Sequence, residues 1–187
     1  MKNKPGNNRD SCDQGGACDP KAVLEEAYDR CGPDLYRYAL MLLVDHDAAQ
    51  DALQQAFLKM TKMSRRIMEI ESLDNYLRTV VRNECYGIIK TRRQSGNVVK
   101  ELSSEPILEK VTGEIIDEDE EKLIEAALRK LPPDQREVLH LKVYENKTFR
   151  QIEELIGIPL NTAASRYRYA IDKLREILLF DDKTKNI

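Results

Sequence analysis

The chain has 187 residues, of which 41% are hydrophobic, 34% are charged and 6% are aromatic, with a formal net charge of −3. This length suits one ordinary domain or two small helical ones, and the apolar content can fill a core, which excludes an entirely disordered chain. Abundant charge, few aromatic residues and only eight Gly and seven Pro favour helices over a strand-rich sandwich, so we expect an all-α protein.

No run of apolar residues approaches the ~20 that a membrane-spanning helix requires, and residues 1–16 lack the apolar core of a signal peptide. We therefore expect a cytoplasmic protein that does not insert into a membrane. In that compartment Cys12, Cys18, Cys31 and Cys85 should remain thiols, and their spacing matches no paired zinc motif. A redox or metal role for Cys12 and Cys18 is the alternative; otherwise we expect no metal and no cofactor.

Changes in composition divide the chain into five parts. The first is rich in Gly, Asn and Asp, with nothing apolar at helical spacing to offset its ordering entropy. The two longest parts carry apolar residues at helical spacing and predict small helix bundles. The parts are a disordered N-terminal arm at residues 1–20, a first domain at 21–94, an acidic flexible linker at 95–121, a second domain at 122–180 and a tail at 181–187.

Three helices are predicted in the first half of the first domain. Because proline disfavours a continuing helix, the Gly32-Pro33 pair should end the first of them. The second helix then covers residues 34–45. The third begins at Asp45 or Asp47, either of which can serve as the N-cap.

The fourth helix begins after Ser72 and has one apolar and one basic face. Cations near its C-terminal end interact favourably with the helix dipole. The basic face, however, has five basic residues with Glu84 to balance them, which is a larger excess than the dipole requires. The stretch from Lys59 to Arg93 contains nine basic and four acidic residues. This local excess favours a nucleic-acid partner despite the negative net charge. The face opposite the apolar one shows Arg78, Arg82, Asn83, Tyr86, Lys90, Arg92 and Arg93.

The linker holds most of the acidic excess, since Glu101 to Glu121 contains nine acidic residues and one basic residue.

After the linker, the proline pair at Pro132 and Pro133 opens a helix, because proline fits the first helical turn. A helix of about two turns follows and should end at Gly157, which can adopt a positive φ. A short Gly-containing turn between two helices is typical of the helix-turn-helix motif.

The last helix of this motif has short polar residues near its N-terminus, where the backbone can approach phosphates, and Arg166 can reach a guanine edge. An ordinary solvated face with scattered arginines is the alternative interpretation. The Gly157 turn and the separate basic helix favour DNA binding.

Two stretches resemble extracytoplasmic-function (ECF) sigma factors of bacterial RNA polymerase. The sequence "LPPDQREVLHLKVYENKTFRQIEELIGIPLNTAASRYRYAIDKLREIL" is similar to their region four. "LYRYALMLLVDHDAAQDALQQAFLKM" and "SLDNYLRTVVRNECYGIIKTRR" are similar to region two. The resemblance implies a sigma factor that binds core polymerase and directs transcription initiation through the −10 and −35 promoter elements.

The resemblance also implies partners and residue roles. The partners are the clamp helices of the largest polymerase subunit, the flap of the second-largest subunit, promoter DNA and an anti-sigma factor. The residues that would read the −35 element are Asn161, Thr162, Ser165, Arg166 and Arg168. Those that would engage the −10 element are Asn75, Tyr76, Arg78, Arg82, Asn83, Lys90, Arg92 and Arg93. Those that would dock on polymerase are Asp51, Gln54 and Gln55.

Two other classes of function are alternatives to this one. A dimeric helix-turn-helix repressor acting without polymerase would need a self-complementary interface, and no helix is a candidate for it. A helical adaptor could use the same basic faces to bind an acidic protein. An enzyme is not expected, because His46 and His140 fall in different domains and outside any catalytic motif, with His140 at the surface or boundary of its helix.

Overall fold

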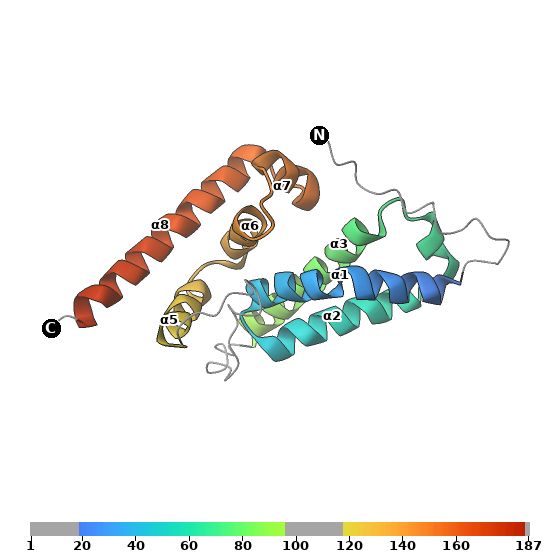
Figure 1. The fold of residues 1–187 in the computed structure, drawn as a ribbon, viewed down its shortest axis with the longest axis horizontal. Helices are drawn as coiled ribbons and strands as arrows, with labels where there is room; N and C mark the ends of the chain where they lie inside the picture. The colour runs from blue at the N-terminus through green and yellow to red at the C-terminus, as the bar shows by residue number, and fades with distance from the viewer. Residues whose placement is uncertain (1–18, 96–117, 186–187) are drawn as a thin grey trace.

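The computed structural model describes residues 19–95 and 118–185, and all regular elements in these two ranges are helical (Figure 1). The expected all-α fold is confirmed. Residues 1–18 of the expected disordered arm, with Cys12 and Cys18, lie outside the described residues, whereas Asp19 and Pro20 cap and begin the first helix. Residues 96–117 of the expected linker also lie outside them, whereas residues 118–121 already belong to the first helix of the second domain.

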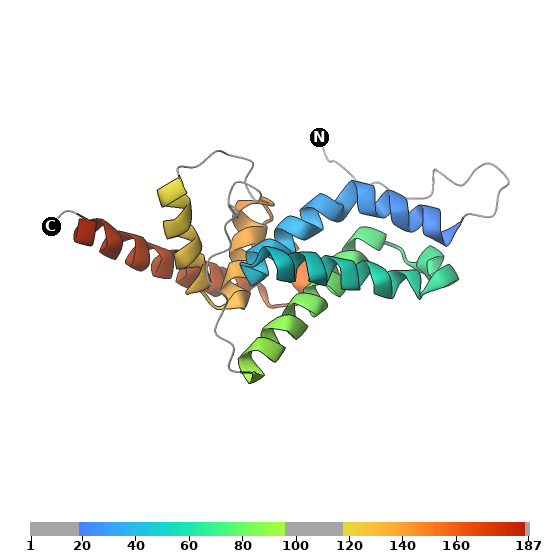
Figure 2. The same ribbon diagram turned by 90° about the horizontal axis from the view of Figure 1, so that it is seen from below.

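The first domain contains α1 (Pro20–Leu43), α2 (His46–Thr61), the 3-10 helix η1 (Ser64–Glu69) and α3 (Leu73–Gln94). Asp45 caps α2, because its side chain accepts a hydrogen bond from the backbone N–H of Ala48 at 2.9 Å. The three long helices contact one another in every pairing, so they form a compact bundle (Figure 2).

The expected break at Gly32-Pro33 is wrong, because α1 continues through Pro33 as a single helix. A proline inside a helix removes one backbone hydrogen bond, here to the carbonyl of Asp29. Asp29 and Pro33 are both exposed, so water can take the place of the missing partner. Leu24 and Leu35, on either side of the proline, are both buried in the same core, which stabilises the uninterrupted helix.

The second domain contains α5 (Glu118–Arg129), α6 (Pro133–Val143), α7 (Phe149–Ile156) and α8 (Leu160–Lys185). Helix α8 packs against α5, α6 and α7. Proline at the start of α6 agrees with the prediction from sequence.

The two domains pack directly on each other, with α6 beside the C-terminal half of α1 (Figures 1 and 2). Val138 and Leu141 of α6 belong to the same buried cluster as Leu42 of α1. Met41 of α1 is fully buried within the core of the second domain, where it joins Leu128 and other apolar side chains. The prediction that His140 lies at the surface or boundary of its helix is wrong. The side chain is 3% exposed, because the first domain covers this part of α6.

Candidate nucleic-acid interface

The helix-turn-helix of the second domain is built by local capping. Thr148 accepts a hydrogen bond from the N–H of Gln151, and the Gln151 side chain accepts one from the N–H of Thr148, which forms a capping box at the start of α7. Gly157 ends the helix with φ +69°, as predicted. Glu153 then accepts a hydrogen bond from the N–H of Leu160, and so ties α7 to the start of α8.

Helix α8 presents a polar side away from the core. Ala163 and Ala170 are fully buried, which fixes the rotation of the helix about its axis. The five residues predicted to read DNA lie within the first three turns of the helix. Asn161 and Arg168 are exposed, whereas Thr162, Ser165 and Arg166 are half-buried. The structure therefore brings this predicted set together on one short segment.

Both arginines in this segment have partners within the chain. The Nε atom of Arg166 lies 3.0 Å from a carboxylate oxygen of Asp134, in the first turn of α6. The guanidinium of Arg168 lies 5.2 Å from the centre of the Tyr169 ring. Both arrangements hold the positive charge near the surface, where a phosphate or a base edge can replace the partner.

Helix α3 divides the residues predicted for the −10 element between two stripes. One stripe is exposed and polar, and Tyr76 lies beside it with its hydroxyl 3.6 Å from the Met63 sulfur. This exposed stripe includes the predicted residues Asn75, Asn83 and Lys90. Arg93, near the end of the helix, is also exposed. These side chains are available for contact with DNA.

The second stripe of α3 is cationic and faces the second domain. Arg82 binds the carboxylate of Glu137 with two hydrogen bonds, of 2.6 and 3.2 Å. Arg78 binds Glu145 at 2.6 Å. Both predicted arginines are therefore engaged by carboxylates from the α6 segment.

Arg92 differs from the other basic residues of α3. It donates a 2.8 Å hydrogen bond to Asp45, the residue that caps α2. Burial alone would raise the pKa of Asp45, but the hydrogen bond from Ala48 and the charge of Arg92 outweigh it and hold the pKa below its usual value. Arg92 thus stabilises the first domain in this structure.

Glu137 is the functional candidate that the sequence did not reveal. Its side chain is 0% exposed, and besides Arg82 it accepts hydrogen bonds from the hydroxyls of Tyr38, at 2.5 Å, and Tyr86, at 2.8 Å. Burial and the neighbouring carboxylate raise the pKa of both tyrosines, so both hydroxyls remain donors. A glutamate amid apolar residues was the only local signal, and its partners come from 51 to 99 residues away.

The residues predicted to dock on polymerase form one exposed patch on α2. Asp51, Gln54 and Gln55 are all exposed and lie within one helical turn of each other. Leu58, one turn further along, is 52% exposed, although its neighbour Phe57 packs edge-on against Tyr28. Leu58 therefore adds an apolar side chain to this otherwise polar surface.

The described cysteines show no sign of activation. Cys31 and Cys85 are free thiols, and burial is the main cause that raises the pKa of Cys31 to about 11 and of Cys85 to about 12. In the described ranges no three His, Cys, Asp or Glu side chains are placed to hold a metal ion. Among the same residues no helix has the length and hydrophobicity needed to cross a bilayer.

Comparison with known proteins decides the family. The family described as Sigma-70 region 2 matches residues 27–94, and the one described as Sigma-70, region 4 matches residues 121–174. The ECF RNA polymerase sigma factor SigL of Mycobacterium tuberculosis is 30% identical over 165 residues, covering 86% of this chain and 92% of SigL. The chain belongs to the ECF sigma factors.

Other relatives agree with this assignment. The RNA polymerase sigma-E factor of Streptomyces coelicolor is 29% identical over 163 residues, covering 86% of this chain and 89% of the relative. The sigma factor RpoE of Bartonella quintana, solved in complex with the anti-sigma factor NepR, has a similar fold. Its TM-score is 0.67 at 23% identity, over 85% of this chain and 98% of RpoE. The resemblance inferred from the sequence is confirmed, and none of these matches favours the repressor.

As an ECF sigma factor, the protein acts with RNA polymerase in transcription initiation and is not an enzyme. Its two domains correspond to the two family regions in the expected order.

Proposed function

We propose that this sigma factor binds core RNA polymerase and selects promoters by engaging the −10 element with its first domain and the −35 element with its second. The observation that carries the proposal is the pairing, in one chain of this family, of a helix-turn-helix at α7–α8 with a basic helix at α3. Two separate DNA-binding surfaces suit two separate promoter elements.

The N-terminal turn of α8 is proposed to enter the major groove at the −35 element. Asn161 and Thr162 let the backbone approach phosphates, and Arg166 is placed to exchange Asp134 for a base edge. Ser165 donates to the carbonyl of Thr162 at 3.0 Å, so its short side chain stays close to the helix backbone. Arg168 supplies a further phosphate contact.

The exposed stripe of α3 is proposed to contact the opened strand of the −10 element. A flipped base needs a stacking partner and polar groups that read its edge. Tyr76, 37% exposed, can provide the first and Asn75 the second. Asn83, Lys90 and Arg93 continue along the helix and can follow the phosphate backbone.

We also propose contacts with two subunits of the polymerase. The α2 patch of Asp51, Gln54 and Gln55 would dock on the clamp helices of the largest subunit, with Leu58 as an apolar anchor. The second domain would meet the flap of the second-largest subunit. We place the protein in the cytoplasm, with its polymerase, and propose an anti-sigma factor as a further partner, as for the RpoE of Bartonella quintana.

The acidic segment between the domains has two proposed roles, which are equally supported. Its carboxylates could occupy a basic nucleic-acid channel of the polymerase, or they could act as a solvated spacer. Replacing Asp117 to Glu121, of which Glu118 to Glu121 form the first turn of α5, with neutral residues should change the ratio of abortive to full-length transcripts only in the first case.

Mapping of transcript starts tests the proposed function. Purified protein is added to core polymerase and genomic DNA, and the starts are compared with those made by core polymerase alone. We expect discrete new starts that share two upstream sequence elements at a fixed spacing. DNA binding with no new starts would instead indicate a DNA-binding protein that works without polymerase.

A further inference from the structure

The seam between the two domains holds a cluster of charged side chains at its centre. The carboxylate of Glu137 on α6 is completely buried and receives four hydrogen bonds, all from α1 and α3 of the other domain. A buried carboxylate is costly unless its oxygens are hydrogen-bonded and its charge is paired. The donors of the first domain meet both requirements, so Glu137 is matched to this docked arrangement.

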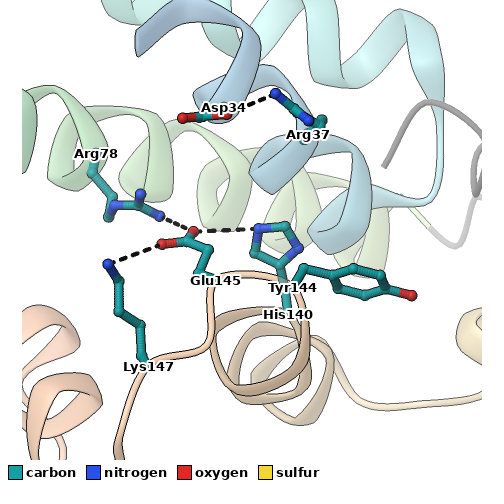
Figure 3. A pocket seen from close by; sticks show the side chains of 7 residues that line it. All are labelled: Asp34, Arg37, Arg78, His140, Tyr144, Glu145 and Lys147. Carbon is teal, nitrogen blue, oxygen red and sulfur yellow. Dashed lines mark hydrogen bonds and ion pairs between the residues drawn. The ribbon is translucent and has the colours of Figure 1, made fainter. Parts of the chain in front are cut away.

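A second ion pair lies further along the same seam. Glu145, just after α6, sits between Arg78 at 2.6 Å, His140 at 3.3 Å and Lys147 at 3.9 Å (Figure 3). These side chains line a cavity of about 340 Å³ between α1, α3 and the end of α6. Burial would raise the pKa of Glu145, but the hydrogen bond from His140 and the charge of Arg78 lower it, so the carboxylate stays ionised.

Arg136, next to Glu137 in sequence, forms the third contact of the seam. Its guanidinium donates to the carbonyl of Leu42 at 2.6 Å and to that of Leu128 at 3.1 Å. Leu42 lies in the last turn of α1, where carbonyls lack helical partners and where a positive charge is favoured by the helix dipole. Arg136 therefore joins the end of α1 to the second domain.

The contacts of Arg78 and Arg82 bear directly on DNA binding. A guanidinium binds a carboxylate with the same pair of parallel hydrogen bonds that it uses for a phosphate. Arg82 is only 27% exposed and Arg78 16%, with α6 and its C-terminal turn over their charged ends. While these contacts persist, a DNA backbone must compete with Glu137 for Arg82 and with Glu145 for Arg78.

We propose that Glu137 and Glu145 act as an intramolecular clasp that holds the free sigma factor closed, by occupying Arg82 and Arg78 in place of promoter phosphates. This inference rests on the proposed role of α3 in DNA binding. The clasp must open when polymerase and promoter separate the two domains. Interfaces between domains of one chain are commonly reversible, and a seam with ion pairs at its centre can be hydrated when it opens.

Glu137→Gln is the direct test, because it removes the charge and keeps the shape of the side chain. The matched control is Glu154→Gln, which removes the same charge from the exposed outer side of α7, where Glu154 is 70% exposed and pairs with Arg150. Small-angle X-ray scattering of the full free chain measures closure. We expect a larger radius of gyration for Glu137→Gln and an unchanged one for Glu154→Gln.

Binding of a fluorescent forked DNA probe that carries the mapped −10 element is the second measurement. If only the open state binds DNA, the apparent Kd falls by the same factor as the open fraction rises. We expect Glu137→Gln to lower the apparent Kd roughly tenfold. Glu154→Gln should change the Kd by less than about twofold, since it alters only long-range electrostatics. A misfolded variant cannot bind more tightly, so an increase in affinity cannot come from lost structure.

Glu145→Gln frees Arg78 and leaves Glu137 in place, so both measurements should change in the same direction but by less. If Glu137→Gln does not fold, Glu145→Gln tests the clasp in its place. Equal radii of gyration and equal Kd values for the clasp variants and the control would overturn the proposal. Such a result, with wild-type protein still directing polymerase to discrete starts, would leave the proposed function intact. Failure of the wild-type protein in that transcription assay would reject the proposed function instead.

Discussion

Arg166 of the recognition helix α8 is paired with Asp134 in the first turn of α6, with 3.0 Å between Nε and the nearer carboxylate oxygen. The pair spans two helices of the second domain and leaves the arginine 27% exposed. Asp134 therefore orients the guanidinium before DNA arrives, and DNA must offer a better partner than this carboxylate. The pair is half-buried but lies near the surface, so a phosphate or a base edge can replace Asp134.

Replacing Arg166 with Ala should weaken binding to a promoter with an intact −35 element by ~1–3 kcal/mol, because a bidentate contact to a base is lost. Arg175→Ala is the matched control, since Arg175 is 72% exposed on the same helix but lies beyond the proposed contact segment. Titration of the polymerase complex with labelled promoter DNA measures both. An unchanged Kd for Arg166→Ala would remove this residue from the readout.

Reversing the charge at Asp51 should weaken association with core polymerase. Asp51→Arg places a cation in the exposed α2 patch and leaves the buried face of that helix untouched. Asp29→Arg, at an exposed position of α1 outside the patch, controls for the change in net charge. Competition for core polymerase against a labelled sigma factor should show at least a tenfold weaker Asp51→Arg protein, on the order of 1.4 kcal/mol. Equal competition by both variants would place the docking surface elsewhere.

Asp45 should make the first domain sensitive to acid. Its pKa is lower in the folded protein than in the unfolded chain, so its contribution is fully present above about pH 4 and is lost as the pH falls through the folded pKa. Asp45→Asn keeps an N-cap but loses the charge that pairs with Arg92. Thermal unfolding followed by circular dichroism should show a difference of ~1 kcal/mol at pH 7 that shrinks as the pH falls below about 4. A difference of constant size across the acid range would contradict the ionic contribution.

Two glycines should respond in opposite directions to alanine. Gly157 has φ +69°, so Gly157→Ala should destabilise the second domain by ~1–2 kcal/mol, although nothing lies within 4 Å of the added carbon. Gly87 lies inside α3, also with open space around it, so Gly87→Ala should stabilise the first domain by ~0.5–1 kcal/mol. Denaturant unfolding of each variant measures both. Equal shifts of the same sign would show that backbone conformation does not govern the Gly157 turn.

Local patterns predicted the features that depend on local physics. The buried positions Leu77, Val81 and Cys85 of α3 follow from helical spacing, and the positive φ of Gly157 follows from the turn between two helices. The predicted helix end at Pro33 is wrong because the local preference of proline does not take tertiary packing into account. Burial of Leu24 and Leu35 in one core stabilises α1 across the proline.

The contacts between domains could not be predicted from sequence. His140 and Glu137 look like polar surface residues when α6 is considered alone, because the first domain that covers them is distant in the chain. Arg78 and Arg82 were correctly placed on one basic face, but which group they meet depends on how the two bundles dock. Long-range pairing of this kind leaves no periodic signal in the sequence.

Site-directed crosslinking in the polymerase–promoter complex tests the central claim most directly. A photoreactive group is placed at Asn161 on α8 or at Asn83 on α3, both of which are exposed, and the crosslinked nucleotides are mapped. We predict that the Asn161 probe marks the −35 element, that the Asn83 probe marks the −10 element, and that both signals require core polymerase. Crosslinks from both probes to one symmetric site, formed equally well without polymerase, would contradict it.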